Sequence, residues 1–231
     1  MATKMEQHNL AGARGASLWV VAAMGFLVLE AIAAAAFEPA YSYARNYISD
    51  LGLPSGALVH GHPIYSPRAY LMHAAFYLQG VLFLLGALLI VGIPDSPRAR
   101  MFLGTVATNA VGNIVVGSVP SGTAHIAGAV LAIVGGNAAI LVGSGVIGPL
   151  NTWCRYRGVS KVIAALGLLC FAMLMIKSAT AKTYLLPDGA WERGSVYSIT
   201  GWQLLTAACL LTRSTRAAAR SGSRQRPGPR R

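Results

Sequence analysis

The sequence is poor in charged residues. Only 11% of its 231 residues are Asp, Glu, Lys or Arg, whereas about a quarter of the residues are charged in a soluble globular domain. Hydrophobic residues make up 55% of the chain, and a soluble protein of this size cannot bury so much apolar surface. The excess is therefore expected to face lipid. This composition excludes a disordered chain, a disulfide-stabilised scaffold and an ordinary soluble enzyme.

Cysteine is also scarce, and the common motifs of nucleotide and hydrolase chemistry are missing. The three cysteines, Cys154, Cys170 and Cys209, form no CxxC pair and no Cys–His spacing typical of zinc. None lies in a predicted outer loop, so no exported disulfide is expected. The sequence has no Walker loop, dinucleotide fingerprint or Gly-x-Ser-x-Gly elbow. No motif of these classes therefore defines a reaction.

Long apolar runs dominate what is present. A membrane-spanning helix needs about 20 mostly apolar residues, and six stretches qualify: 18–37, 70–92, 101–119, 124–148, 159–181 and 196–212. The third and sixth are only marginally apolar, so we expect them to sit inside a bundle. The first exceeds the 7–15 apolar residues of a signal peptide and is interpreted as a retained span. The sequence predicts an all-α bundle of six transmembrane helices in residues 16–212, with an outer loop at 38–69.

The distribution of basic residues predicts the orientation of this bundle. Most of the 19 Lys and Arg residues lie in the segments before the first span and after the second, fourth and sixth. Basic loops remain cytoplasmic, so both termini are expected inside. Residues 1–15 form a cytoplasmic segment, and the Arg-rich tail, 213–231, is expected to be disordered and attracted to anionic lipid headgroups. No specific nucleic-acid binding is expected.

Polar side chains gather toward the outer ends of the predicted spans. An ionisable residue inside a membrane costs roughly 2.5–3.5 kcal/mol and often marks a functional site. Glu30 is the clearest case, and its alternative role is to order the bundle by pairing with Lys177 or Asn113. The pattern predicts a polar pocket that opens outward. The candidate ligand-binding residues are Glu30, Arg45, Asp50, Asn113, His125, Glu192 and Arg193.

The histidines allow sharper hypotheses. His73 and His125 are predicted at one depth, where together with Asp50 they could hold a metal such as zinc, or the two histidines could face a haem. Ser49 beside these three residues would complete a candidate catalytic set. The alternative is that each histidine simply bonds a backbone carbonyl or water. His60 and His62, in the outer loop, form only a weak motif.

Several segments together resemble a known family. The string Tyr47-Ile48-Ser49-Asp50-Leu51-Gly52 resembles the signature of the family called domain of unknown function 998. Segments 112–120, 125–128 and 191–193 are similar to its later spans, so the resemblance covers about residues 16–212. It implies a six-span protein of the prokaryotic plasma membrane, distantly similar to the Frag1, DRAM and Sfk1 group. It assigns no role to the matching residues, which are Ser49, Asp50, His125, Glu192 and Arg193.

Three functions are compatible with these features. The first is a protein that binds or organises membrane lipids, with Arg45 and Arg193 engaging a phosphate; the link to lipids is an analogy with the distant relatives. The second is a metal-dependent lipid hydrolase built on the catalytic set above. The third is a proton-coupled transporter that uses Glu30 and Lys177. The ligand, the presence of catalysis and the oligomeric state stay open at this point.

Overall fold

The computed structural model of the protein describes residues 4–59, 61–148, 150–180 and 185–224. Within them the chain forms six α-helices, one short 3-10 helix and one two-stranded antiparallel hairpin. The fold is therefore all-α apart from this hairpin. The elements are α1 Lys4–Ala34, η1 Ser49–Gly52, β1 Leu58–Val59, β2 His62–Pro63, α2 Ala69–Val91, α3 Pro97–Ser118, α4 Thr123–Gly143, α5 Cys154–Thr180 and α6 Asp188–Arg224.

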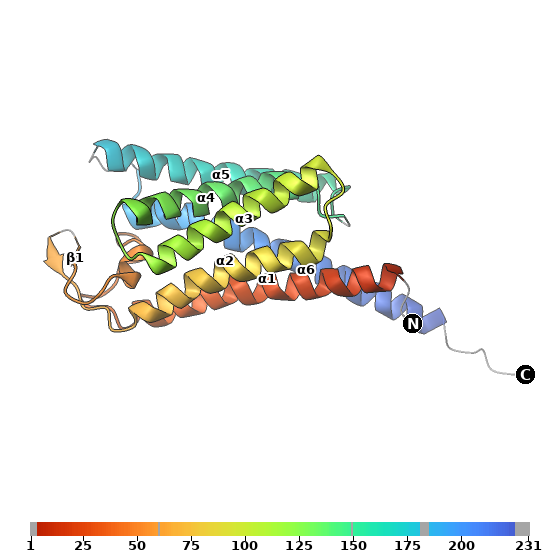
Figure 1. The fold of residues 1–231 in the computed structure, drawn as a ribbon, viewed down its shortest axis with the longest axis horizontal. Coiled ribbons are helices and arrows are strands. Elements are labelled where there is room, and N and C mark those ends of the chain that lie inside the picture. The colour runs from red at the N-terminus through yellow and green to blue at the C-terminus, as the bar shows by residue number, and fades with distance from the viewer. Residues whose placement is uncertain (1–3, 60, 149, 181–184, 225–231) are drawn as a thin grey trace, which may run out of the picture.

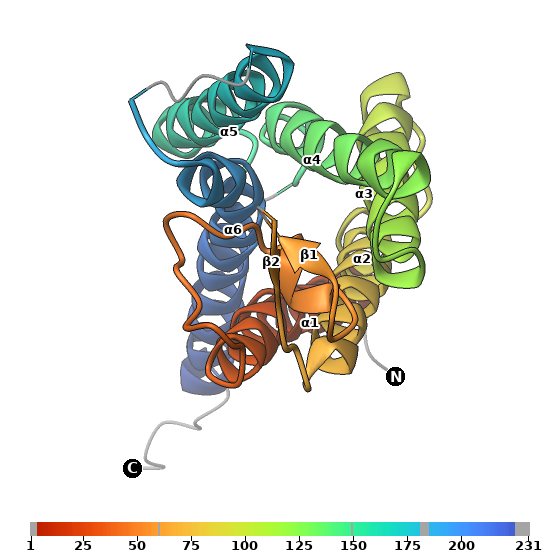
Figure 2. The same cartoon turned by 90° about the vertical axis from the view of Figure 1, so that its left-hand side faces the viewer.

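The six helices run up and down along a common axis (Figure 1). Each helix packs beside the next one in the chain, and α6 returns to pack against α1. Seen along the axis, the helices form a ring (Figure 2). As a result α1 begins and α6 ends at the same end of the bundle (Figure 1), which is the arrangement that an even number of crossings requires.

Five of the described helices are long and apolar enough to cross a membrane. These segments are Leu10–Ala34, Ala69–Val91, Pro97–Ser118, Thr123–Gly143 and Cys154–Ser178. They confirm the prediction of a multi-pass helical membrane protein. Helix α6 is not among them, and its surroundings explain why.

Helix α6 buries polar side chains against its neighbours. Ser195, Thr200, Gln203 and Thr206 are all at most 2% exposed. A helix enclosed by other helices does not have to be apolar on every side, because its polar groups bond within the protein. The low apolarity of the sixth stretch therefore reflects a position inside the bundle.

Small residues allow α3 and α4 to approach closely. A Cβ added to Gly112 would lie 2.3 Å from the backbone nitrogen of Ala132 and 2.5 Å from the carbonyl oxygen of Gly128. These atoms belong to the backbone and cannot move aside. The close packing brings the Asn109 amide within 2.6 Å of the Ala132 carbonyl oxygen. The small-residue pattern thus positions polar side chains between helices.

Two segments differ from the sequence-based expectation. Helix α4 ends at Gly143, where a series of turns begins, whereas the apolar run predicted a span to residue 148. Helix α6 continues to Arg224, whereas the sequence predicted a disordered tail from residue 213. Three consecutive alanines at 217–219 favour continuation of the helix, since Ala is the best helix former. Residues 225–231 of the predicted tail lie outside the described residues.

Candidate functional site

The loop between α1 and α2 covers one end of the helix ring (Figure 2). Its central segment, 41–53, is organised by short polar contacts. The Asp50 carboxylate accepts a hydrogen bond from the Tyr47 backbone N–H at 2.9 Å, and the Asn46 side-chain oxygen accepts one from Ser42 N–H at 3.0 Å. Asp50 is 5% exposed, so this candidate ligand-binding residue instead shapes the loop turn.

Arg193 fastens this segment to α6. Its guanidinium donates to the backbone carbonyls of Tyr43 at 2.7 Å, Asn46 at 2.8 Å and Gly189 at 3.2 Å. It also donates to the Tyr41 hydroxyl and lies over the Tyr43 ring, 4.9 Å from the ring centroid. Arginine suits this role because its planar group presents several donors in a fixed geometry.

Glu30 supplies the counter-charge for Arg193. A distance of 3.0 Å separates its Oε1 from Arg193 Nη2, and its Oε2 accepts a hydrogen bond from the Tyr197 hydroxyl at 2.7 Å. Glu30 is 1% exposed and Arg193 7%. Glu30 therefore pairs with Arg193 rather than with Lys177 or Asn113, because α6 packs directly against α1.

Lys177 contributes to a second connection at this end of the bundle. It forms an ion pair with Asp188 at the start of α6, and Asp188 also accepts a hydrogen bond from the Tyr47 hydroxyl at 3.1 Å. Burial raises the pKa of Tyr47, and the nearby Asp188 raises it further. Burial also raises the pKa of Tyr41, although Arg193 opposes that shift. Both phenols consequently stay protonated and act as donors, that of Tyr41 to the Tyr47 carbonyl at 2.8 Å.

Glu192 holds the segment at a further point. Its Oε2 accepts a hydrogen bond from the backbone N–H of Ile48. Ile48 and Ser49 lie directly over a cavity inside the ring, and Glu192 lines the same cavity. The segment from Tyr41 to Leu53 is hereafter called the lid segment, because two consecutive residues of α6 hold it over this cavity.

The cavity has a volume of about 530 Å³, including the space at its mouth. Helices α1, α2, α3, α4 and α6 form its walls, and the lid segment covers one end. Its lining is mainly apolar. The lining residues are Phe26, Ile48, Ser49, Phe76, Gln79, Asn109, Asn113, Val116, His125, Ala129, Ala132, Ile133, Glu192, Val196, Ile199 and Thr200.

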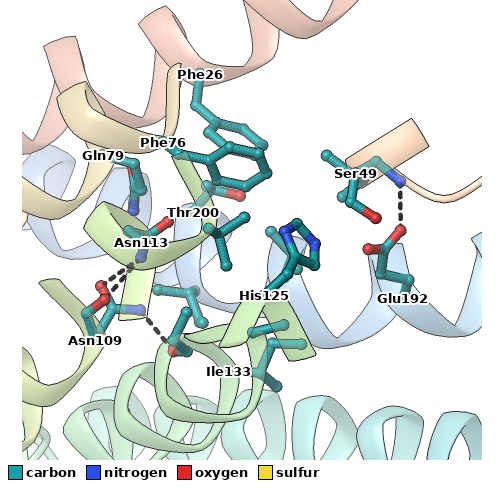
Figure 3. A pocket seen from close by; sticks show the side chains of 16 residues that line it. Phe26, Ser49, Phe76, Gln79, Asn109, Asn113, His125, Ile133, Glu192 and Thr200 are labelled. Carbon is teal, nitrogen blue, oxygen red and sulfur yellow. Dashed lines mark hydrogen bonds between the residues drawn. The ribbon is translucent and has the colours of Figure 1, made fainter. Parts of the chain in front are cut away.

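Polar groups are concentrated at the two ends of this cavity. Figure 3 shows Ser49 and Glu192 at one end and Gln79, Asn109 and Asn113 at the other. The rings of Phe26 and Phe76 lie between them, 5.6 Å apart between centroids. This pattern of apolar walls with a few polar groups is typical of small-molecule sites.

The two histidines each bond a backbone carbonyl. His125 Nδ1 is 2.7 Å from the Val119 oxygen, and His73 Nε2 is 2.7 Å from the Gly52 oxygen. Among the described residues, no group of three or more His, Cys, Asp or Glu side chains could hold a metal ion. His73, His125 and Asp50 therefore do not form the zinc site considered for the sequence.

The structure brings only some of the predicted candidates to the cavity. Ser49, Asn113, His125 and Glu192 line it, whereas Glu30 and Arg193 fill a separate buried network beside it. Arg45 is exposed on the lid segment. His60, one of the weak candidates, lies outside the described residues.

Sequence reasoning missed two residues that complete these networks. They are Tyr41, whose hydroxyl bonds Arg193, and Gln79, which lines the cavity. A glutamine in the middle of a strongly apolar run was the available signal for Gln79. Tyr41 gave no comparable signal, because aromatic residues are common near membrane interfaces.

The ring of apolar helices defines a multi-span helical membrane protein. Comparison with known families is consistent with this class and names one family. The model of the family described as "Protein of unknown function (DUF998)" matches residues 20–209. The chain belongs to this family, which confirms the resemblance noted in its sequence. Neither a curated protein nor a solved structure matches the chain.

Proposed function

We propose that this protein is a six-pass membrane protein that binds the hydrocarbon chain of a membrane lipid in the cavity beneath the lid segment. The observation that carries the proposal is the cavity itself. Apolar and aromatic side chains from several helices surround it, with a few polar groups among them, as is typical of ligand pockets. Its walls are apolar and it lies among helices suited to a bilayer, so an acyl or isoprenoid chain matches both its chemistry and its surroundings.

The position of the cavity suits a ligand that enters from the outer leaflet. The lid segment lies at the end of the bundle opposite the start of α1 and the end of α6 (Figure 1). With the basic segments cytoplasmic, that end faces outward from a prokaryotic plasma membrane. Gln79 and Asn109 lie near the middles of α2 and α3, so a bound chain would reach toward the bilayer midplane.

The proposed lipid binding does not include the contact between Arg45 or Arg193 and a phosphate that the sequence suggested. Arg193 bonds Glu30, Tyr41 and the lid-segment carbonyls and does not line the cavity. Arg45 is exposed and does not line the cavity. The supported contact is therefore with the apolar chain, and the headgroup has to be argued separately.

The other two functions gain less from the geometry. The hydrolase needs Ser49, Asp50 and the two histidines around one metal, whereas Asp50 bonds the lid-segment backbone. The transporter needs a mobile proton on Glu30 or Lys177, yet each is held in an ion pair. Lipid binding requires no rearrangement of these groups and is the function we favour.

A bulky residue in the cavity tests the proposal. In Ala129→Phe, a phenyl ring would occupy space beside His125, whereas Ala127→Phe places the same ring on an exposed face of α4. The measurement is crosslinking of a photoactivatable long-chain fatty alcohol to purified protein, with unlabelled alcohol as competitor. We expect saturable labelling of wild type and Ala127→Phe, and at least a tenfold loss in Ala129→Phe. Equal labelling of both variants with unchanged melting temperatures would refute cavity binding.

A further inference from the structure

We infer that the cavity selects lipids whose head is uncharged and donates hydrogen bonds, such as a fatty alcohol or an acylglycerol, over lipids with an anionic head. This inference rests on the proposed binding of a hydrocarbon chain and adds the chemistry of the head. It follows mainly from two lining residues, His125 and Asn113, whose free polar atoms are acceptors.

His125 offers an acceptor at the mouth of the cavity. Its Nδ1 lies 2.7 Å from the carbonyl oxygen of Val119, and a carbonyl oxygen only accepts hydrogen bonds. Nδ1 must therefore carry the proton, and in the neutral ring Nε2 is left with a lone pair. No hydrogen bond to this second nitrogen is formed within the described residues.

Asn113 offers an acceptor deeper in the cavity. Its Nδ2 donates to the backbone carbonyl of Asn109 at 2.9 Å and to the side-chain oxygen of Asn109 at 3.2 Å. Because the backbone partner can only accept, the atom facing Asn109 must be the nitrogen. The oxygen of Asn113 consequently lies on the opposite side of the amide (Figure 3), and no donor among the described residues bonds it.

Gln79 adds an unsatisfied polar atom at the same depth. Its Nε2 donates to Gln203 Oε1 at 2.7 Å, which leaves Gln79 Oε1 and Gln203 Nε2 without a hydrogen-bond partner although both side chains are buried. The pair thus presents one free acceptor and one free donor. A buried acceptor left unpaired costs about 1–3 kcal/mol. A hydroxyl group that reached this end of the cavity would remove that penalty.

The local charge opposes an anionic head. Glu192 lines the mouth, where burial raises the pKa of its carboxyl to about 8. Without it, the adjoining networks still contain more carboxylates than cations: Glu30, Asp50 and Asp188 against Lys177 and Arg193. Both cations are already paired with carboxylates. A phosphate or carboxylate head would thus lose its hydration beside negative charge. It would also face acceptors, to which it has no proton to donate, so neither interaction stabilises it. An ammonium head would be attracted by the carboxylates near the mouth, but it would lose its hydration on reaching the neutral acceptors of His125 and Asn113, which favours an uncharged donor there.

Four ligands with the same chain separate these possibilities. Oleyl alcohol, oleyl methyl ether, oleate and oleylamine are used as competitors against the photoactivatable fatty alcohol on purified wild-type protein. A net hydrogen bond contributes about 0.5–1.5 kcal/mol, so we expect the alcohol to compete roughly two- to tenfold better than the ether. The alcohol should also exceed oleate and oleylamine.

Variants locate the acceptors. His125→Leu and Asn113→Leu should each reduce the advantage of the alcohol over the ether while leaving competition by the ether unchanged. The matched controls are His62→Leu, on the exposed hairpin, and Asn151→Leu, beyond the other end of α4. Both controls should keep the wild-type preference. Because the wild-type panel already measures the preference, the test does not depend on the folding of any variant.

The outcomes distinguish this inference from the proposed function. If none of the four ligands competes, chain binding itself is wrong and both ideas fall. If all four compete equally, chain binding stands and selection by the head is overturned. Tightest competition by oleate or by oleylamine overturns it as well.

Discussion

Arg193 and Glu30 are 163 residues apart in the chain and form an ion pair of 3.0 Å inside the bundle. Glu30 comes from α1 and Arg193 from the first turns of α6, so the pair joins the first and last helices where the ring closes. The same guanidinium holds the backbone of the lid segment. A single buried cation thus couples closure of the helix ring to the position of the lid segment.

Removal of the Glu30 charge should destabilise the bundle. Breaking a buried ion pair at one partner typically costs about 3–5 kcal/mol, because the other charge stays buried without compensation. Glu30→Gln keeps one acceptor oxygen for Arg193, and its NH2 group can instead donate to the Tyr197 hydroxyl, so we expect a loss near the lower end of this range. Thermal unfolding in detergent measures it.

A double-mutant cycle provides the control for this pair. Glu30→Gln combined with Arg193→Gln should lose less stability than the sum of the two single changes, because the double variant buries no lone charge. Strict additivity would show that the two side chains are not energetically coupled. Arg193→Gln alone should remain the more damaging single change, since it also loses the bonds to the lid segment.

Release of the lid segment should be measurable without disrupting the bundle. Glu192→Ala removes the acceptor for the Ile48 backbone N–H, whereas Glu192→Gln retains a side-chain oxygen at the same place. We expect faster hydrogen exchange across residues 41–53 in Glu192→Ala than in wild type, and near wild-type exchange in Glu192→Gln. Equal exchange in the two variants would mean that Glu192 does not hold the lid segment.

The contact between α3 and α4 provides a test of packing. Gly112→Ala introduces a Cβ within 2.3 Å of backbone atoms of α4, whereas at Gly104, on the same helix, a Cβ would meet nothing within 4 Å. Overpacking of this kind costs typically 1–3 kcal/mol, so Gly112→Ala should lower the melting temperature. Gly104→Ala should leave it unchanged or raise it slightly, because Ala favours helix. Similar melting temperatures for the two variants would contradict the close approach.

Much of the fold could be predicted because its cause is local. Apolar runs determine where the helices lie, and the basic segments indicate which ends of the helices share a side of the membrane. The ring closure is different, because it depends on which helices pack together, and no local pattern states that α6 returns to α1. For this reason Lys177 was considered as the partner of Glu30, whereas the structure places Arg193 there.

Part of the cavity could also be predicted from local sequence. Polar residues near the outer helix ends indicated a pocket, and Asn113, His125 and Glu192 do line one. Its apolar walls were not foreseen, because residues such as Phe26 and Phe76 look like any lipid-facing or core residue in a sequence. Only the packed structure shows which apolar side chains surround empty space.

The sixth crossing, which composition alone leaves undecided, can be tested by labelling single cysteines. Leu185 is 91% exposed just before α6, and Thr215 is exposed toward the other end of this helix; the native Cys154 is exposed at the start of α5. Each is examined as the sole cysteine, with the others replaced by alanine, using a membrane-impermeant maleimide. A six-pass bundle with cytoplasmic termini predicts labelling of Leu185→Cys in intact cells, and of Thr215→Cys and Cys154 only in inverted vesicles. Labelling of Leu185→Cys and Thr215→Cys from the same side would show that α6 does not cross the membrane, and the outward-facing cavity would then need a different account.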